Sequence, residues 1–148
     1  MKTKVLFRGV HNSARSQMAE AFLNHLCPDD FIAESAGLEP DTLNPLVVQV
    51  MLEVGIDISQ KGTQGVFELF RAGQLFSHVI SVCHEANAER CPVFPGFARY
   101  QTWSFPDPSA VTGSQVERLA QIRDLIEAQV KCWCTDESPF RFMDCPRE

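Results

Sequence analysis

The sequence predicts an α/β fold, with a parallel sheet covered by helices on both faces in a three-layer arrangement. Short apolar runs alternate along the chain with segments whose apolar residues recur at helical spacing, and this alternation is typical of parallel sheets. The run Val5-Leu6-Phe7 is apolar on both faces, as expected for a central strand. The 148 residues suffice for one domain with a substantial core.

Four segments are predicted as strands from their apolar and β-branched residues. They are Lys4–Arg8, Phe31–Glu34, His78–Val82 and Arg99–Trp103. The second is expected to end before Ser35-Ala36-Gly37, because small residues and glycine favour a turn. Ligands of parallel sheets bind beyond the carboxyl ends of the strands, so residues that follow these strands are the first site candidates.

Helical periodicity and end signals predict four helices, which begin near Ser13, Asn44, Thr63 and Ser114. Asn44-Pro45 combines an N-cap residue with a proline in the first turn, and Ser114-Gln115-Val116-Glu117 has the pattern of a capping box. Ser13 is placed to cap the first helix, whose apolar stripe is expected to include Phe22 and His25. Residues 1–134 are predicted to form the domain, and residues 135–148 an irregular C-terminal tail.

Composition and charge limit the partners of this chain. A formal net charge of -6 argues against nonspecific binding to nucleic acid or to an anionic membrane surface. No apolar run approaches the roughly 20 residues that span a bilayer. The N-terminus leads from Met1 directly into a core strand without a signal peptide, so we expect a cytoplasmic protein. We also expect a monomer.

The strongest site signal lies between the first strand and the first helix. It consists of Gly9, Val10, His11, Asn12, Ser13, Ala14, Arg15 and Ser16. A loop in this setting points successive N–H groups inward, and the dipole of the helix adds partial positive charge. Arg15 adds a planar guanidinium that matches a tetrahedral oxyanion. The stretch therefore predicts a site for phosphate, sulfate or arsenate, with no tightly bound cofactor; His11 is expected to be structural or peripheral.

This stretch resembles the loop of the low-molecular-weight tyrosine phosphatases, and within them the thioredoxin-coupled arsenate reductases. The family's loop reads Cys, five residues, Arg and Ser, and the following Gln17-Met18-Ala19-Glu20 also looks like the family. The resemblance covers about residues 3 to 134 and implies a four-stranded sheet in 2-1-3-4 order. Position 9, however, is glycine where the family keeps its nucleophilic cysteine, and Arg8 stands where an apolar residue is expected.

The resemblance also implies roles for residues outside the loop. Asp107, between two prolines, matches the family's general acid. Cys83 and Cys91 match the second and third cysteines of the arsenate reductases, which release arsenite and pass the resulting disulfide to thioredoxin. His84 departs from the acidic residue expected after the second cysteine.

Other candidate ligands are weaker. Ser35 and Thr63 fall where some family members bind a monovalent cation, but Gly65 replaces a ligating aspartate, so we do not predict that ion. The cysteines Cys132, Cys134 and Cys145 form a weak metal pattern, and no metal is predicted. Cys27 is expected in the core. Six cysteines in a cytoplasmic chain indicate thiols, redox chemistry or metal binding before structural disulfides.

Glycine cannot form a covalent adduct with arsenate or phosphate, so turnover is expected to be lost or severely reduced, while anion binding can persist. Three interpretations remain open. The chain is an arsenate reductase by descent that has lost its nucleophile, a non-catalytic module that binds an oxyanion or a partner protein, or a phosphatase-like enzyme with a different mechanism. Tyrosine phosphatase activity is the least favoured, because Tyr100 is not where phosphatases keep the aromatic walls that hold phosphotyrosine.

Overall fold

The structure is a computed structural model that describes residues 2–12, 14–82, 96, 98–105 and 113–135. Its elements are β1 (Thr3–Gly9), α1 (Arg15–Leu26), β2 (Phe31–Gly37), α2 (Pro45–Leu52), α3 (Val66–Arg71), β3 (His78–Ser81), β4 (Arg99–Thr102) and α5 (Gln115–Thr135). The four strands form one sheet in the order β2-β1-β3-β4, and all the neighbouring pairs are parallel. The predicted fold class and strand order are confirmed.

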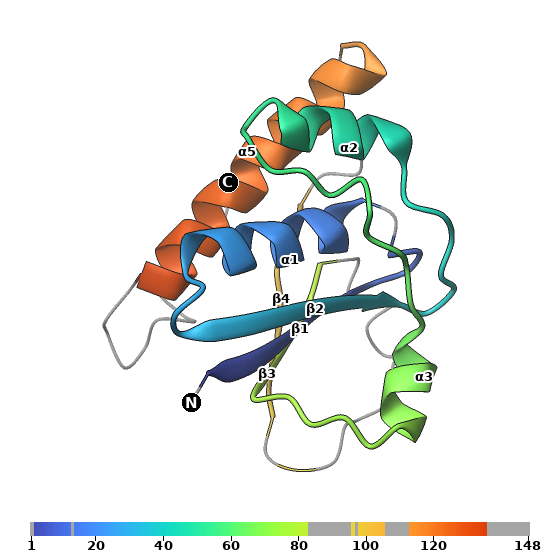
Figure 1. The fold of residues 1–148 in the computed structure, drawn as a ribbon, viewed down its shortest axis with the longest axis vertical. Helices are drawn as coiled ribbons and strands as arrows, with labels where there is room; N and C mark the ends of the chain where they lie inside the picture. The colour runs from blue at the N-terminus through green and yellow to red at the C-terminus, as the bar shows by residue number, and fades with distance from the viewer. Residues whose placement is uncertain (1, 13, 83–95, 97, 106–112, 136–148) are drawn as a thin grey trace.

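The helices lie on the two faces of this sheet (Figure 1). Helices α1, α2 and α5 cover one face, where α5 contacts both α1 and α2, and α3 lies on the other. Strand β1 is central and pairs with β2 from Thr3 to Gly9 and with β3 from Val5 to Arg8. The turn from β1 to α1 therefore lies at the carboxyl edge of the sheet, between strands β2 and β3.

Each face of the sheet has its own core cluster. On the α1 and α5 face, Phe7 packs on Trp103 with ring centroids 5.6 Å apart, and Trp103 packs on Trp133 at 6.0 Å. The smaller cluster contains Leu6, Ala36, Val66, Leu69, Phe76 and Val79. The alternation of Leu6 and Phe7 between these clusters is the outcome expected for a central strand.

Two local expectations are wrong. Strand β2 continues through Ser35-Ala36-Gly37, because these residues pair with the end of β1 and their backbone hydrogen bonds outweigh the turn preference of small residues. His25 is exposed, and Leu23 is fully buried instead. The N-cap of α1 is Ala14, which makes no side-chain cap hydrogen bond; the predicted cap, Ser13, lies outside the described residues.

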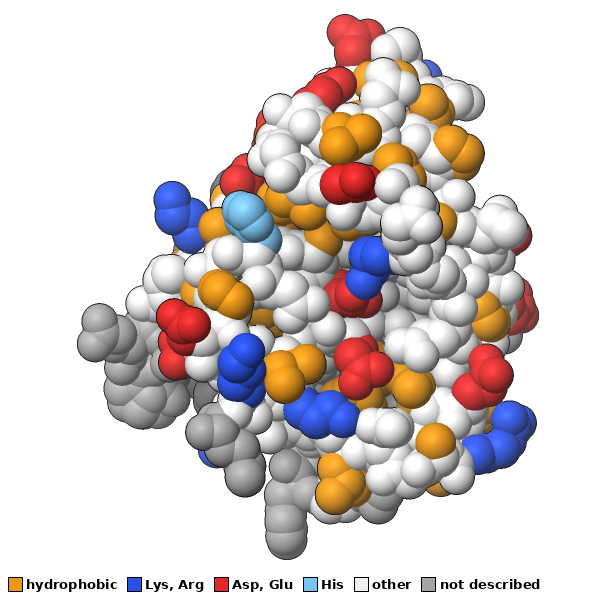
Figure 2. Space-filling view, in the orientation of Figure 1, with side chains coloured by type: hydrophobic (Ala, Val, Ile, Leu, Met, Phe, Trp, Pro, Cys, Tyr) orange, Lys and Arg blue, Asp and Glu red, His pale blue; other side chains and the backbone are white. Residues whose placement is uncertain are grey.

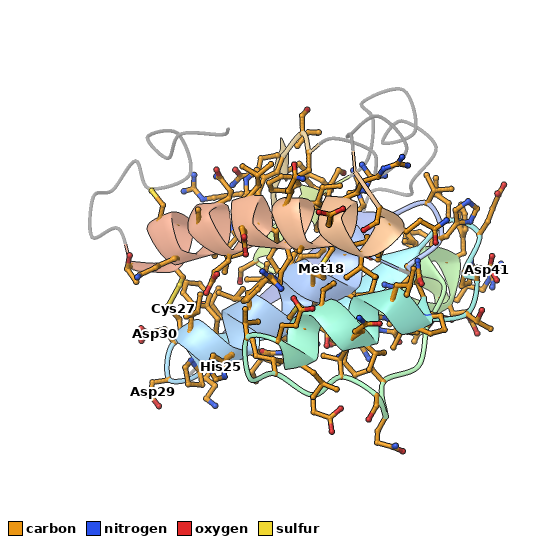
Figure 3. The ribbon with its side chains drawn as sticks, turned by 90° about the horizontal axis from the view of Figure 1, so that it is seen from above. Met18, His25, Cys27, Asp29, Asp30 and Asp41 are labelled. Atoms are coloured by element: carbon orange, nitrogen blue, oxygen red, sulfur yellow. A yellow bond between two sulfur atoms is a disulfide. The ribbon has the colours of Figure 1, made fainter. Side chains whose placement is uncertain are left out.

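The Sγ atoms of Cys27 and Cys134 are joined in a disulfide that connects the residue after α1 to the end of α5 (Figure 3). Cys132 is also disulfide-bonded. The expectation that the cysteines are thiols or metal ligands before they are structural disulfides is wrong for Cys27, Cys132 and Cys134. Sequence reasoning missed the pair because its members are 107 positions apart and no local pattern connects them.

Within the described part of the chain, no helix is both long enough and apolar enough to cross a membrane.

Candidate oxyanion site

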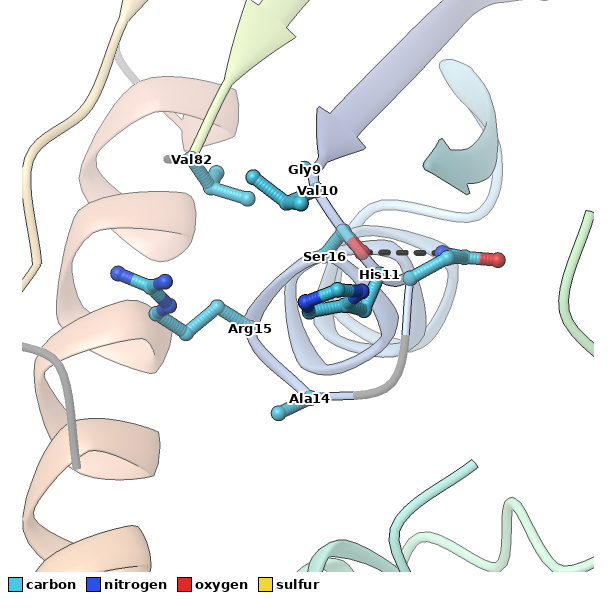
Figure 4. Close-up of a pocket in the computed structure, with 8 residues that line it drawn as sticks. Gly9, Val10, His11, Ala14, Arg15, Ser16 and Val82 are labelled. Atoms are coloured by element: carbon cyan, nitrogen blue, oxygen red, sulfur yellow. Dashed lines mark hydrogen bonds between the residues drawn. The ribbon is translucent and has the colours of Figure 1, made fainter. Parts of the chain in front are cut away.

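A pocket of about 70 Å³ lies at the carboxyl end of β1 (Figure 4). It is lined by Gly9, Val10, His11, Asn12, Ala14, Arg15, Ser16 and Val82. Every predicted loop residue that the structure describes thus lines one cavity; Ser13 lies outside the described residues. The volume corresponds to roughly two to three water molecules, which suits a small anion rather than an aromatic ring.

The backbone of the loop is held from one side by the segment that follows β2. The carbonyl oxygens of Gly9, Val10 and His11 accept hydrogen bonds from the amides of residues 38, 39 and 41, at 3.1, 2.7 and 2.9 Å. In a trans peptide the carbonyl and the next N–H point in opposite directions. The N–H groups of residues 10, 11 and 12 therefore face away from the segment that follows β2. In the described part of the chain, no backbone–backbone hydrogen bond uses the amides of Val10 or His11 as donors.

Asn12 fixes the turn of the loop. Its backbone is left-handed, with a φ of 56°, a conformation that asparagine adopts more readily than most residues. The side chain is 2% exposed, accepts a hydrogen bond from the Gln64 amide at 3.0 Å and donates one to the Ser16 Oγ at 2.9 Å. Asn12 is therefore a structural residue of the loop. His11 is exposed, and its Nδ1 lies 3.1 Å from the Glu39 carbonyl oxygen, in agreement with a peripheral role.

Gly37, at the end of β2, is a residue of the site that sequence reasoning missed. A Cβ at position 37 would lie 2.7 Å from the Val10 carbonyl oxygen and 2.8 Å from the Asn12 nitrogen, closer than real contacts allow. The loop therefore rests directly on the backbone of β2, which only glycine permits here. The available signal was the glycine in Ser35-Ala36-Gly37, which we interpreted as a turn.

Arg15, the first residue of α1, supplies the positive charge of the pocket. Its Nη1 donates a hydrogen bond of 3.2 Å to the Phe105 carbonyl oxygen, and the side chain extends away from His11 and Ala14, on the side of the loop where Val82 lies (Figure 4). A guanidinium has five N–H donors, and among the described residues the Phe105 carbonyl is the one hydrogen-bond acceptor found for Arg15, which leaves further donors for an anion. The N-terminus of α1 adds partial positive charge at the same place.

This positive charge is local. Figure 2 shows acidic and basic side chains interspersed over the face it presents, without a single field of positive charge. The net charge of the chain is -6. Attraction of an anion must therefore come from the loop amides, the α1 terminus and Arg15 rather than from the surface as a whole.

Position 9 has room for a side chain. A Cβ built on Gly9 would lie 3.6 Å from the Ser16 Oγ and 4.0 Å from Val82 Cγ2, which are ordinary van der Waals contacts. Gly9 is also not among the residues with a positive φ. Neither space nor backbone conformation therefore requires glycine at position 9, in contrast to Gly37.

The Arg8 side chain lies on the face of the sheet opposite to α1 and is buried, with 7% exposure. Its Nε donates to the Ser81 Oγ at 2.7 Å, and its guanidinium carbon lies 5.4 Å from the centre of the Tyr100 ring. The aromatic ring and hydroxyl stabilise this buried cation. Tyr100 is accordingly a partner of Arg8 and not a wall of the pocket.

A cluster of Glu20, Ser35 and Lys61 supports the loop through hydrogen bonds of Gln64. The Glu20 carboxylate accepts a hydrogen bond of 2.6 Å from the Ser35 hydroxyl and is in contact with the Lys61 ammonium group. Burial lowers the pKa of Lys61, while contact with the Glu20 carboxylate favours its charged form. The Gln64 Nε2 donates to the Ser35 carbonyl oxygen, and the backbone N–H of Gln64 donates to the Asn12 Oδ1. Gln64 thus connects this cluster to the loop.

Lys61 thus supplies a positive charge beside Ser35 and Thr63, where the family resemblance suggested a monovalent cation. These residues line a hollow of about 350 Å³ together with Glu20, Glu34, Gly62 and Gln64. Among the described residues, no group of three or more His, Cys, Asp or Glu side chains is arranged to hold a metal ion.

Replacing Lys61 by methionine is expected to lower the free energy of unfolding by about 2 kcal/mol. The Glu20 side chain is only 10% exposed and would lose its cationic partner. The expected loss of stability is smaller than the ~3–5 kcal/mol typical of a broken buried ion pair, because the Lys61 side chain is 31% exposed. Urea unfolding measures the change. The double variant Lys61→Met with Glu20→Gln is the control and should recover part of the loss, and equal stability of both variants would argue against a charge effect.

The remaining predicted site residues lie outside the described residues: Cys83 and Cys91 fall within 83–95, and Asp107 within 106–112. Their described chain neighbours are at the pocket. Val82 lines the pocket, and the Phe105 carbonyl oxygen binds Arg15.

Comparisons with known proteins identify the family. The sequence model of the low molecular weight phosphotyrosine protein phosphatases matches residues 4–138. The chain is 37% identical over 134 residues to an arsenate reductase of Shouchella clausii, covering 88% of this chain and 94% of that protein. It is 35% identical over 136 residues to an arsenate reductase of Bacillus subtilis, covering 88% and 95%.

Solved structures agree with the sequence relatives. An arsenate reductase in the phosphate-binding state superposes with a TM-score of 0.70 at 29% identity, covering 88% of this chain and 95% of that one. A thioredoxin-dependent arsenate reductase of Corynebacterium glutamicum has a TM-score of 0.63 at 29% identity, covering 84% and 58%. The chain thus belongs to the low molecular weight phosphotyrosine protein phosphatase family and, within it, to the arsenate reductases.

Proposed function

We propose that this chain is an arsenate reductase that retains the oxyanion site and the thioredoxin-coupled relay but has lost its nucleophile at position 9. The observation that carries this proposal is the pocket at the β1–α1 turn. Its floor at Gly37, its turn at Asn12 and its cation at Arg15 are all present, although position 9 has no side chain. A phosphate-binding arsenate reductase of the same fold supports an oxyanion as its ligand.

The proposed roles follow from chemistry and from family membership. The loop amides and Arg15 hold phosphate, sulfate or arsenate over residues 9 to 15. Asp107 would protonate the leaving oxygen. With a cysteine at position 9, that cysteine would form the S–As bond as water leaves, and Cys83 would attack its sulfur, so that the two sulfurs join as a disulfide while arsenic gains two electrons and leaves as arsenite. Cys91 would then take over the disulfide. Thioredoxin then reduces that disulfide; a relative described as a thioredoxin-dependent arsenate reductase supports this partner.

The same proposal gives the setting of the protein. Thioredoxin is a cytosolic reductant, so we place the proposed reaction in the cytoplasm; the Cys27–Cys134 disulfide is an exception to the reduced thiols expected there. We also propose that it acts as a monomer. The family match to residues 4–138 supports a domain that ends close to the end of α5.

A second candidate, a non-catalytic oxyanion-binding module, is favoured by the glycine itself. The absence of a thiolate removes a negative charge from the pocket, which favours anion binding. The two candidates differ in one measurement. The variant Gly9→Cys, supplied with arsenate and thioredoxin, forms arsenite if the site and the relay are intact and does not if the chain is a binding module.

The substitution Arg15→Ala is expected to abolish the thermal stabilisation produced by phosphate. A ligand at about 100 times its Kd stabilises by about 2.7 kcal/mol, which corresponds to roughly 5–10 °C for a domain of this size. Melting curves with and without phosphate measure the shift. Arg71→Ala, at an exposed position of α3, is the matched control and should keep it; the same shift in Arg15→Ala would show that phosphate binds elsewhere.

A further inference from the structure

The guanidinium of Arg15 is held by a distant part of the chain. Its Nη1 donates to the Phe105 carbonyl oxygen at 3.2 Å, and the two residues are 90 positions apart. An arginine side chain on its long stem otherwise adopts many rotamers, and ordering it costs conformational entropy. The contact with Phe105 therefore limits where the cation of the pocket can lie.

This hydrogen bond leaves the anion-binding edge of the guanidinium open. The Nε–H and one N–H of Nη2 point to the same edge of the planar group, and such an edge binds two oxygens of one anion. Among the described residues, neither Nε nor Nη2 of Arg15 has an acceptor. The Phe105 carbonyl can therefore hold the guanidinium in place without competing with an anion for these two donors.

The aromatic ring of Phe105 attaches its carbonyl to the core. Phe105 is 8% exposed and packs edge-on against Trp103, with ring centroids 6.5 Å apart and an interplanar angle of 88°. Trp103 is 1% exposed and packs in turn on Phe7 and Trp133. No backbone–backbone hydrogen bond joins Phe105 to another described residue. In this part of the chain, ring packing is therefore what fixes the position of the carbonyl.

Trp103 is itself fixed to the sheet beside the pocket. Its backbone N–H donates to the Ser81 carbonyl oxygen at 2.7 Å, and the next residue, Val82, donates to the Arg8 carbonyl oxygen at 2.9 Å. Val82 also lines the pocket. The aromatic cluster and the oxyanion pocket thus share the same end of strands β1 and β3.

We propose that Phe105 is a positioning residue for Arg15. The packing of its ring on Trp103 places the carbonyl oxygen, and this oxygen orients the guanidinium for the oxyanion. The inference rests on the proposed function, because it concerns the anion site of that function. The contribution of Phe105 is to order a flexible arginine in advance, so that less entropy is lost when the anion binds.

The test is a calorimetric titration with inorganic phosphate. Phe105→Leu, which loses the ring, should raise the Kd for phosphate by about threefold to tenfold, and Phe105→Tyr, which keeps a ring, should restore it. Phe31→Leu is the matched control. Phe31 is 5% exposed and packs on Trp133 at 5.1 Å, but it lies at the amino end of β2, away from the pocket. Its variant should lose stability and keep the Kd.

The outcomes separate the inference from the proposed function. Phosphate that binds the unmodified protein and Phe105→Leu equally well would overturn the inference and leave the oxyanion site standing. An equal rise of the Kd in Phe31→Leu would also overturn it, because the effect would then reflect a general loss of stability. An unmodified protein that binds no phosphate would overturn both.

A second measurement needs no substitution and applies even if Phe105→Leu does not fold. With ¹⁵N-labelled arginine, NMR spectra of the unmodified protein in phosphate-free buffer should show separate Nη1 and Nη2 signals for Arg15. The reason is that a hydrogen bond at Nη1 slows rotation of the guanidinium. A single averaged signal would show that the Phe105 carbonyl does not hold the side chain, and the inference would be wrong.

Discussion

Replacing Gly9 by cysteine is expected to raise the rate of thioredoxin-dependent arsenate reduction by roughly 10⁶-fold, the order of the loss when a catalytic nucleophile is deleted from another enzyme. The site is ready for this change. A Cβ at position 9 makes only ordinary contacts, and the backbone there is not left-handed. The new sulfur would lie next to the Ser16 hydroxyl, at the N-terminus of α1, where a thiolate is favoured.

Arsenite formation coupled to the oxidation of reduced thioredoxin measures this gain. Gly9→Ser is the matched control, since its side chain fits the same space but is a much weaker nucleophile, and it should stay close to the unmodified protein. Adding Arg15→Ala to Gly9→Cys should remove most of the gained activity by removing the oxyanion clamp. A folded Gly9→Cys that binds phosphate but reduces no arsenate would favour the binding module.

Removing the Cys27–Cys134 crosslink is expected to lower the free energy of unfolding under oxidising conditions by about 2–5 kcal/mol. The two residues are 107 positions apart, so the bond closes a long loop and restricts the unfolded chain strongly. Such a loss is a large part of the roughly 5–15 kcal/mol that stabilises a typical domain. It corresponds to a fall in melting temperature of roughly 4–20 °C.

Guanidinium unfolding of the double variant Cys27→Ala with Cys134→Ala measures this loss, and the single variant Cys132→Ala shows what the neighbouring cysteine contributes. Helix α1 has 12 residues and is about 18 Å long, so the crosslink at one end lies far from the pocket at the other. The phosphate-induced melting shift of the double variant should therefore be unchanged. A stability equal to that of the oxidised parent would show that the disulfide does not form in solution.

The fold could be predicted from the sequence because its signals are local. Alternating apolar runs and helical stripes determined the class, and the resemblance of Gly9–Ser16 to a phosphatase loop determined the strand order. Strand β2 was predicted too short because the pairing of residues 35–37 with β1 is a long-range effect. Exposure of His25 likewise depends on how α1 packs, which the helical pattern alone does not determine.

The residues that line the pocket could be predicted from the sequence, but the contacts that support the loop could not, and oxyanion binding at this pocket stays a prediction. The loop, Arg15 and the peripheral place of His11 could be recognised along one continuous stretch. The Lys61 ammonium on Glu20 and the Cys27–Cys134 bond join residues distant in sequence, so no local pattern indicates them. The roles of Cys83, Cys91 and Asp107 stay predictions.

The direct contact between Gly37 and the backbone of residues 10–12 limits how this pocket can diversify. A floor made of two main chains in contact cannot be deepened or lowered by exchanging side chains, because no side chain is there to exchange. Preference among anions of different size must therefore be tuned through side chains that line the pocket elsewhere, such as Val10, Ala14 and Val82. Engineering of this scaffold toward larger oxyanions should begin at those side chains and leave the sheet edge untouched.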